Sequence, residues 1–244
     1  MGFFRLLAQS LDAYLENMRL ILFFSIPFLV ALPLALVLPN FASLGSIFLR
    51  LGSVRTDLTI PEAVLIVAAF AVSLFVFAGT LVAINMVIKS QRTMMKITRY
   101  ELERLEEHAF RLFFIFLAIF VASLAVDMVL YQYGLHATLG ALFAFAAATL
   151  ALFAPQAVVI DNMSAGHAVQ LSASLFVRRF PYVVSFFIFA GLLLMLNAFI
   201  FLQLQQTPIG ALARYLAIAV NALFILPFLE VLKTQIYLSK YTIL

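Results

Sequence analysis

Five polar residues interrupt long apolar stretches of the chain and are the side chains best placed to carry an ion or a polar solute. They are Asn85, Asp127, Asn197, Arg214 and Asn221. Polar groups are costly in hydrocarbon, so they line pathways or pair with one another. Asp127 and Arg214 are predicted at a similar depth near the outer ends of their helices, so we expect an ion pair between them. A polar path through a helix bundle and a purely structural role in helix packing are the two interpretations.

A second set of residues places positive charge on one face of a predicted helix. It consists of Lys89, Arg92, Lys96 and Arg99, and glutamates follow it. One interpretation is a solvated helical hairpin, basic at the lipid headgroups and acidic beyond them. The other is a surface that binds anionic lipid or docks a cytoplasmic partner protein such as an ATPase.

No pattern of residues indicates catalysis, metal binding or a cofactor. The histidines His108, His136 and His167 fall in different segments, and the chain has no cysteine. Ser172 and Ser174 lie outside any nucleophile elbow, and no glycine loop that could cradle a phosphate is present. We therefore expect a non-enzymatic protein with no catalytic residue, no cofactor and no metal site.

The elements that carry these residues are expected to be membrane helices. The chain has 244 residues, of which 66% are hydrophobic and 11% charged, well outside the range of soluble domains. Backbone polar groups in hydrocarbon must be bonded within the chain, and continuous rather than alternating apolar runs favour helices over a barrel. The net charge of +4 comes without a solvated basic domain, which argues against nucleic acid as a partner.

Six apolar stretches are each long enough to cross about 30 Å of hydrocarbon as a helix. They are residues 20–38, 63–88, 110–131, 137–157, 182–203 and 209–232. Residues 1–19 are expected to form an amphipathic helix in the interface, with an apolar face of Leu7, Leu11, Tyr14, Leu15 and Met18. Residues 1–244 are thus predicted to be a single all-α integral membrane domain, a polytopic bundle of six transmembrane helices with an N-terminal interfacial helix.

The distribution of basic residues predicts that both termini lie in the cytoplasm, because Lys and Arg near span ends are retained on that side. With this orientation the outer side holds Arg50, Arg55 and Arg214. The inner side holds Arg5, Arg19, Lys89, Arg92, Lys96, Arg99, Arg104, Arg111, Arg178, Arg179, Lys233 and Lys240. The predicted location is the cell membrane, with the lipid bilayer as the first partner.

Two local patterns lead to further expectations about helix packing. Gly140, Ala144 and Ala148 present small residues at four-residue spacing, which lets helix backbones approach closely. We expect this helix at the centre of the bundle, and the alternative is the contact face of a homo-oligomer. Between the first two predicted spans, the apolar spacing of residues 41–51 predicts a short amphipathic helix on the outer surface.

One segment resembles a known family. It reads Ala154-Pro155-Gln156-Ala157-Val158-Val159-Ile160-Asp161-Asn162, then Ala165 to Ser172, then Arg178-Arg179. Over about residues 154–180 this is similar to the multi-span membrane domain attached to some glycerophosphodiester phosphodiesterases, and to related prokaryotic membrane proteins. The resemblance implies a six-helix fold and no activity, because the catalytic barrel of those enzymes has no counterpart here. Within this chain the segment also predicts an inner-surface helix over residues 164–177.

Two functions remain as hypotheses. The first is a permease-type transport component, which fits the size, the expected spans and the polar residues at depth, by analogy at the level of the fold. The second is a membrane scaffold or assembly subunit whose role is helix packing and contact with lipid or a partner.

Overall fold

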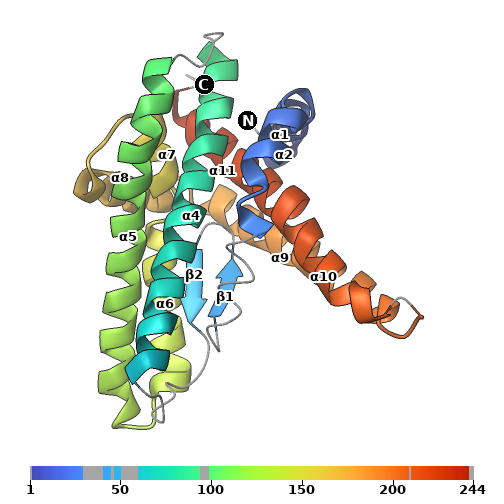
Figure 1. The fold of residues 1–244 in the computed structure, drawn as a ribbon. Helices are drawn as coiled ribbons and strands as arrows, with labels where there is room; N and C mark the ends of the chain where they lie inside the picture. The colour runs from blue at the N-terminus through green and yellow to red at the C-terminus, as the bar shows by residue number, and fades with distance from the viewer. Residues whose placement is uncertain are drawn as a thin grey trace.

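The structure of the protein is a computed structural model that describes residues 2–29, 41–44, 47–50, 60–93, 99–208 and 210–241. Nearly all of the described chain is helical, as expected for backbone that must satisfy its own hydrogen bonds in hydrocarbon. Two groups of helices diverge from one end of the molecule: α4, α5 and α6 form one arm, and α9 with α10 forms the other (Figure 1). The expectation of a helical membrane protein is confirmed.

The longest helices, α4 (Ile60–Thr93) and α5 (Arg99–Tyr131), run side by side through the first arm (Figure 1). Their contact is rich in phenylalanine: the rings of Phe70 and Phe120 lie 4.3 Å apart, and those of Phe75 and Phe110 lie 4.9 Å apart. Both helices extend beyond the predicted spans into the segment that joins them. The predicted helical extension of spans two and three is therefore confirmed on both sides of residues 94–98.

The fourth predicted span is broken into pieces. It contains the π-helix η1 (His136–Gly140), α6 (Ala141–Leu150) and α7 (Ala154–Ile160), with a turn at residues 151–153. The hydroxyl of Ser172 accepts a hydrogen bond of 2.9 Å from the backbone N–H of Phe153 in this turn. A backbone donor freed by the break is thereby satisfied from another helix, which is the condition for non-helical backbone at membrane depth.

The small-residue face of this segment packs closely, as predicted. A Cβ atom added to Gly140 would lie 1.8 Å from Oδ1 of Asp127 on α5, so no larger residue fits without movement. Ala144 and Ala148 are 6% and 4% exposed. Leu142 on the opposite face is 61% exposed, so α6 lies at the edge of the bundle, whereas residues 151–157 in the second half of the same predicted span are buried. The expectation of a central helix is therefore wrong for α6 and correct for α7.

The remaining chain forms a surface helix and a second hairpin. The helix α8 (Ala165–Arg178) follows α7 and confirms the helix predicted over residues 164–177, and its location on the inner surface stays a prediction. The second arm contains α9 (Phe180–Leu204) and α10 (Gly210–Val220), after which the π-helix η2 (Asn221–Ile225), α11 (Leu226–Leu238) and the short η3 (Ser239–Tyr241) return to the centre. Proline 227 near the start of α11 lacks an N–H donor, which accounts for the local departure from α-helical geometry.

The N-terminal helices α1 (Phe3–Glu16) and α2 (Met18–Ser25) lie beside α11 and α4. The predicted interfacial helix is present, but its protein-facing stripe is Leu6, Ser10, Ala13 and Tyr14. Leu11, on the predicted apolar face, is 47% exposed and available to lipid, which is what an interfacial helix requires. Tyr14 donates a 3.3 Å hydrogen bond to the carbonyl of Leu223. In an α-helix this carbonyl would accept from the N–H of residue 227, but Pro227 has no N–H.

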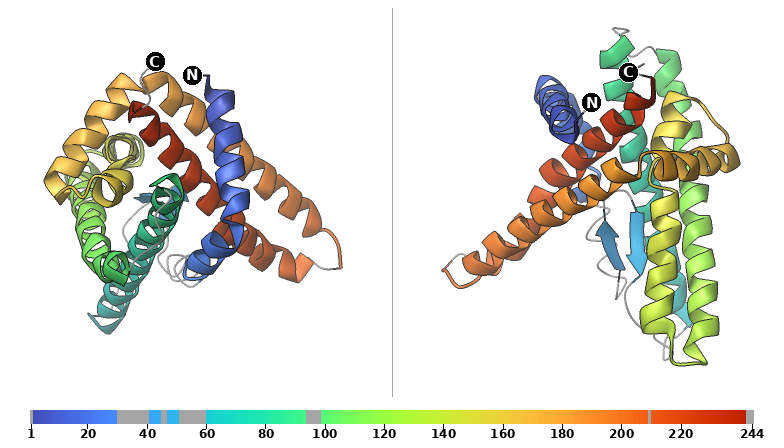
Figure 2. Two further views of the ribbon diagram at one scale, coloured as in Figure 1. Left: turned by 90° about the horizontal axis from the view of Figure 1, so that it is seen from above. Right: turned by 180° about the vertical axis from the view of Figure 1, so that it is seen from behind.

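Residues 41–50 do not form the predicted amphipathic helix. They contain the strands β1 (Phe41–Leu44) and β2 (Ile47–Arg50), which pair antiparallel with Phe41 opposite Arg50 and Leu44 opposite Ile47. Pairing the two strands provides local hydrogen-bond partners for part of the backbone N–H and C=O groups, as a helix would have done. The hairpin lies between the two arms (Figure 2).

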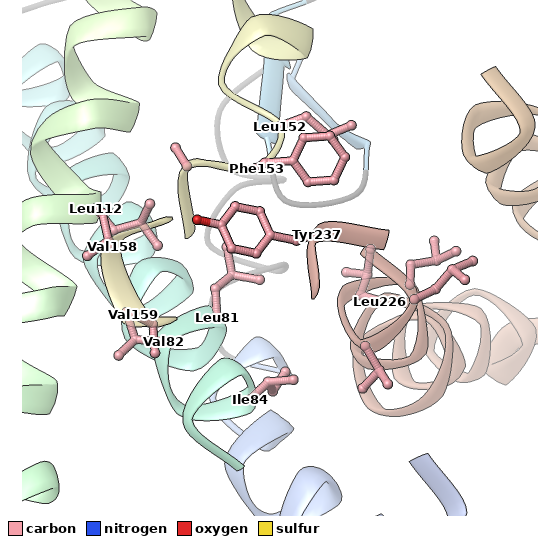
Figure 3. Close-up of a cluster of buried hydrophobic side chains, with 14 of the residues drawn as sticks. Leu81, Val82, Ile84, Leu112, Leu152, Phe153, Val158, Val159, Leu226 and Tyr237 are labelled. Carbon is pink, nitrogen blue, oxygen red and sulfur yellow. The ribbon is translucent and has the colours of Figure 1, made fainter. Parts of the chain in front are cut away.

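The core forms where α4, α7 and α11 meet. Figure 3 shows ten of its side chains, each at most 5% exposed: Leu81, Val82, Ile84, Leu112, Leu152, Phe153, Val158, Val159, Leu226 and Tyr237. The outer faces of α5 and α9 are much less buried, and Met195 on α9 is 70% exposed. Large apolar side chains exposed along whole helices are what a lipid environment requires.

Five helical segments of the described chain are long and apolar enough to cross a membrane. They are Val67–Gln91, Glu103–Tyr131, His136–Ile160, Phe180–Leu204 and Tyr215–Tyr241. The protein is therefore a polytopic membrane protein with five candidate spans. The sixth predicted span, residues 20–38, is not confirmed: α2 ends at Ser25, and residues 30–38 lie outside the described part of the chain.

Candidate functional site

Polar side chains from α4, α7 and α11 converge in the core and form the candidate site. They are Asn85, Gln156, Glu230, Lys233 and Thr234, and each is at most 2% exposed. They come from helices that are distant in the sequence, so only the fold brings them together. The cluster has two opposite charges, two amides and one hydroxyl in a region that is otherwise apolar.

Glu230 is the centre of this cluster. Its Oε1 accepts hydrogen bonds from Nδ2 of Asn85 at 2.6 Å and from Nε2 of Gln156 at 2.8 Å. Its Oε2 lies 2.8 Å from Nζ of Lys233, which is one helical turn further along α11. Hydrogen bonds to a carboxylate are stronger than those between neutral groups, so these contacts fix the position of the Glu230 side chain.

Thr234 joins the two amides. Its hydroxyl lies 2.7 Å from Oδ1 of Asn85 and 2.8 Å from the backbone carbonyl of Glu230, and it accepts at 3.3 Å from Nε2 of Gln156. The remaining atom of the network, Oε1 of Gln156, is buried with no hydrogen-bond partner. An unpaired buried acceptor costs about 1–3 kcal/mol, so a donor at this position would be bound favourably.

Interrupted helices flank the site. Gln156 lies in the first turn of α7, just after the break at residues 151–153, and Glu230 lies one turn after α11 begins at the end of η2. Helices broken near polar residues are a recurrent feature of membrane proteins that bind ions or solutes at depth. The local irregularity and the charged pair thus occur in the same part of the molecule.

A second polar cluster joins α7 to the end of α11 near the chain terminus. Asp161 accepts hydrogen bonds of 2.6 Å from both Tyr237 and Lys240, and it also accepts one from Tyr241. Nζ of Lys240 lies 3.8 Å from the ring centre of Tyr237, a cation–π contact. Burial acts to raise the pKa of Asp161, but the hydrogen bonds from Lys240 and the tyrosines hold it below its usual value.

The residues predicted as one polar path occupy separate places. Asn85 lies in the site, whereas Nδ2 of Asn197 on α9 donates to Oδ1 of Asn221 in η2 at 3.1 Å. Asp127 packs against η1, and α5 and α10 lie on different sides of the molecule in Figures 1 and 2, which does not favour its pairing with Arg214. The side chain of Arg214 lies outside the described part, so the ion pair stays a prediction.

The predicted basic surface is described only at Lys89. Its ammonium donates a 3.0 Å hydrogen bond to the backbone carbonyl of Val159 at the end of α7. This residue therefore helps hold α4 to α7. The side chains of Arg92, Lys96 and Arg99 lie outside the described residues, and their role as a partner or lipid surface stays a prediction.

Four of the five site residues were not predicted from the sequence: Gln156, Glu230, Lys233 and Thr234. Lys233 was assigned to the cytoplasmic flank of the last span, but it is buried in the core with 1% exposure. The signal that could have identified the pair is the spacing of Glu230 and Lys233, opposite charges three residues apart within an apolar helix.

Comparison with protein-family models, with curated proteins and with solved structures finds no match to this chain. The resemblance of residues 154–180 to the phosphodiesterase membrane domain therefore stays a prediction.

Proposed function

We propose that the protein is a permease-type transport component whose polar site is the cluster around Glu230 and Lys233. The observation that carries this proposal is the burial of a complete ion pair, with hydrogen-bonding amides, among helices that are long enough to span a membrane. Ionisable residues buried among membrane helices mark ion or proton pathways in many membrane proteins. Carboxylate and ammonium groups bind and release protons, so the proton is the ion this pair can carry.

The site is closed in this conformation, because its five side chains are shielded from both ends of the molecule. Transport therefore requires a second conformation in which water reaches the cluster. The interrupted helices beside the site are suitable places for such a change, since they have fewer continuous backbone hydrogen bonds than straight helices.

The proposed topology places both termini in the cytoplasm. Both chain ends lie at one end of the molecule, together with the end of α4 and the start of α5 (Figure 1). The start of α4 lies at the opposite end, so the chain passes from one end to the other between α2 and α4. This arrangement supports a sixth crossing, and the basic residues of the sequence favour the cytoplasm for the end with the termini.

The absence of cysteine allows a direct test by single-cysteine labelling of the intact protein. Thr234→Cys places a thiol in the cluster, and Val231→Cys places one in the adjacent apolar core, where the side chain is fully buried. A charged methanethiosulfonate reagent applied to membranes is expected to label position 234 much faster than position 231. Equal and negligible labelling of both would contradict transport and favour the scaffold.

The scaffold remains the second candidate, and one observation favours it. Four of the five site residues have all or most of their polar atoms paired within the protein, as in a network that only fixes helix positions. A role limited to packing predicts that the network stays intact in every conformation. The labelling experiment separates the two roles.

A further inference from the structure

A cavity of about 450 Å³ lies on the face of α4 opposite the polar site, between α2, α4 and α5. This volume is in the range of pockets that hold small ligands. Its walls include Phe24 of α2, Phe75, Gly79 and Ala83 of α4, and Ala109 of α5. The cavity shares no residue with the cluster around Glu230.

Small residues create this space. A Cβ atom added to Gly79 would lie 4.0 Å from the Cβ of Ala109, so the two backbones approach closely here while the side facing α2 remains open. From Phe75 to Ala83 the wall of α4 runs for about 12 Å along the helix. The cavity is therefore elongated parallel to the helices, as a hydrocarbon chain in the bilayer would be.

One charged side chain lines the cavity. Glu106 of α5 is exposed, and among the described residues it forms no ion pair or hydrogen bond. It lies in the first turn of the candidate span Glu103–Tyr131, at the level expected for lipid headgroups. The other polar lining residue, Thr80, already donates its hydroxyl to the carbonyl of Val76 at 2.9 Å.

We propose that this cavity is a lipid-binding site for an aminophospholipid, which places an acyl chain between α2, α4 and α5 and its ammonium group on the carboxylate of Glu106. The apolar wall matches the chain, and the unpaired negative charge matches the headgroup. An acyl chain gains little by leaving lipid for an apolar cavity, because both surroundings are hydrocarbon. Selectivity therefore comes from the charge-assisted hydrogen bond at Glu106.

The test measures retained lipid by native mass spectrometry after reconstitution of the full chain with equal amounts of phosphatidylethanolamine and phosphatidylglycerol. The wild type is expected to retain the ethanolamine lipid preferentially. Glu106→Gln keeps the shape of the side chain but removes its charge, and it should reduce this preference by about two- to fivefold, as expected for an exposed charge pair. Glu103→Gln, on the same helix but outside the cavity lining, is the matched control and should behave like the wild type.

A second variant tests the cavity itself. Ala83→Leu fills the space, and it should reduce retention of both lipids at this site, whereas Glu106→Gln changes only their ratio. The proposal is overturned if the wild type shows no preference, if Glu106→Gln keeps the wild-type preference, or if Ala83→Leu retains the wild-type amount of lipid. Because Glu106 is exposed, its variant tests the proposal even if Ala83→Leu fails to fold.

Discussion

The ion pair between Glu230 and Lys233 provides the sharpest energetic prediction. The perturbation is a double-mutant cycle with Lys233→Met, Glu230→Gln and the combined variant. Lys233→Met leaves a carboxylate that still accepts from Asn85 and Gln156 but has lost its countercharge. Glu230→Gln leaves the ammonium group of Lys233 in the core without the charge of its carboxylate partner. The combined variant is neutral and close in shape to the original pair.

The magnitude follows from burial. Both side chains are 1% exposed, so solvent screening is weak and an unpaired charge would strongly destabilise the fold. Breaking a buried pair costs about 3–5 kcal/mol, whereas replacing both partners by neutral side chains is often close to neutral. Each single substitution should therefore lower the melting temperature by about 6–20 °C, at about 2–4 °C per kcal/mol for a chain of this size. The combined variant should be more stable than either single variant.

In the assay, a fluorescent fusion of each variant is heated in detergent at a series of temperatures. The protein that remains folded is then measured by size-exclusion chromatography. The pair of Glu107 and Arg111 is the matched control, because it is also within one helix but its side chains are 52% and 29% exposed. Its coupling should be about 0–1 kcal/mol. If the effects of Lys233→Met and Glu230→Gln simply add, the two charges do not depend on each other and the reasoning is refuted.

Further substitutions test other contacts, each by the same thermal series. Tyr14→Phe should destabilise by about 1 kcal/mol, because it removes the donor to a carbonyl in η2, and an unchanged midpoint would mean that this hydrogen bond contributes nothing. Asp161→Asn should destabilise at neutral pH. In the folded protein the pKa of Asp161 lies below its usual value of 3.8, so the charged carboxylate stabilises the fold at any pH above 3.8. This stabilisation is lost as the pH falls through the folded pKa, and the wild type and Asp161→Asn should then become equally stable. Gly140→Ala should destabilise by about 1–3 kcal/mol, and the loss should be smaller in an Asp127→Ala background; equal losses would contradict the close contact.

The membrane class, the approximate helices and the surface helix α8 could be predicted from the sequence, because hydropathy and length are local properties. The rotation of each helix could not. Lipid-facing and protein-facing positions are both apolar, so Leu142 and Ala144 differ in burial without an obvious difference in polarity.

The candidate site was harder to predict than the helices. Asn85 was identified because an amide stands out in the middle of an apolar stretch. Gln156, Glu230 and Lys233 lie near the ends of predicted spans, where polar residues normally meet headgroups. Lys233 was therefore placed on the cytoplasmic flank, and the other two were not singled out. Their convergence depends on the break between α6 and α7, for which the sequence gives only Pro155 as a local signal.

The central claim is that the cluster around Glu230 and Lys233 carries ions across the membrane. The most direct measurement is proton flux into vesicles that contain the purified protein and the trapped pH indicator pyranine, under an imposed pH gradient. We predict faster equilibration with the wild type than in empty vesicles, and a return to the empty-vesicle rate with the folded Glu230→Gln, Lys233→Met variant. Equal rates for the wild type and this variant, or no flux above that of empty vesicles, would contradict the claim.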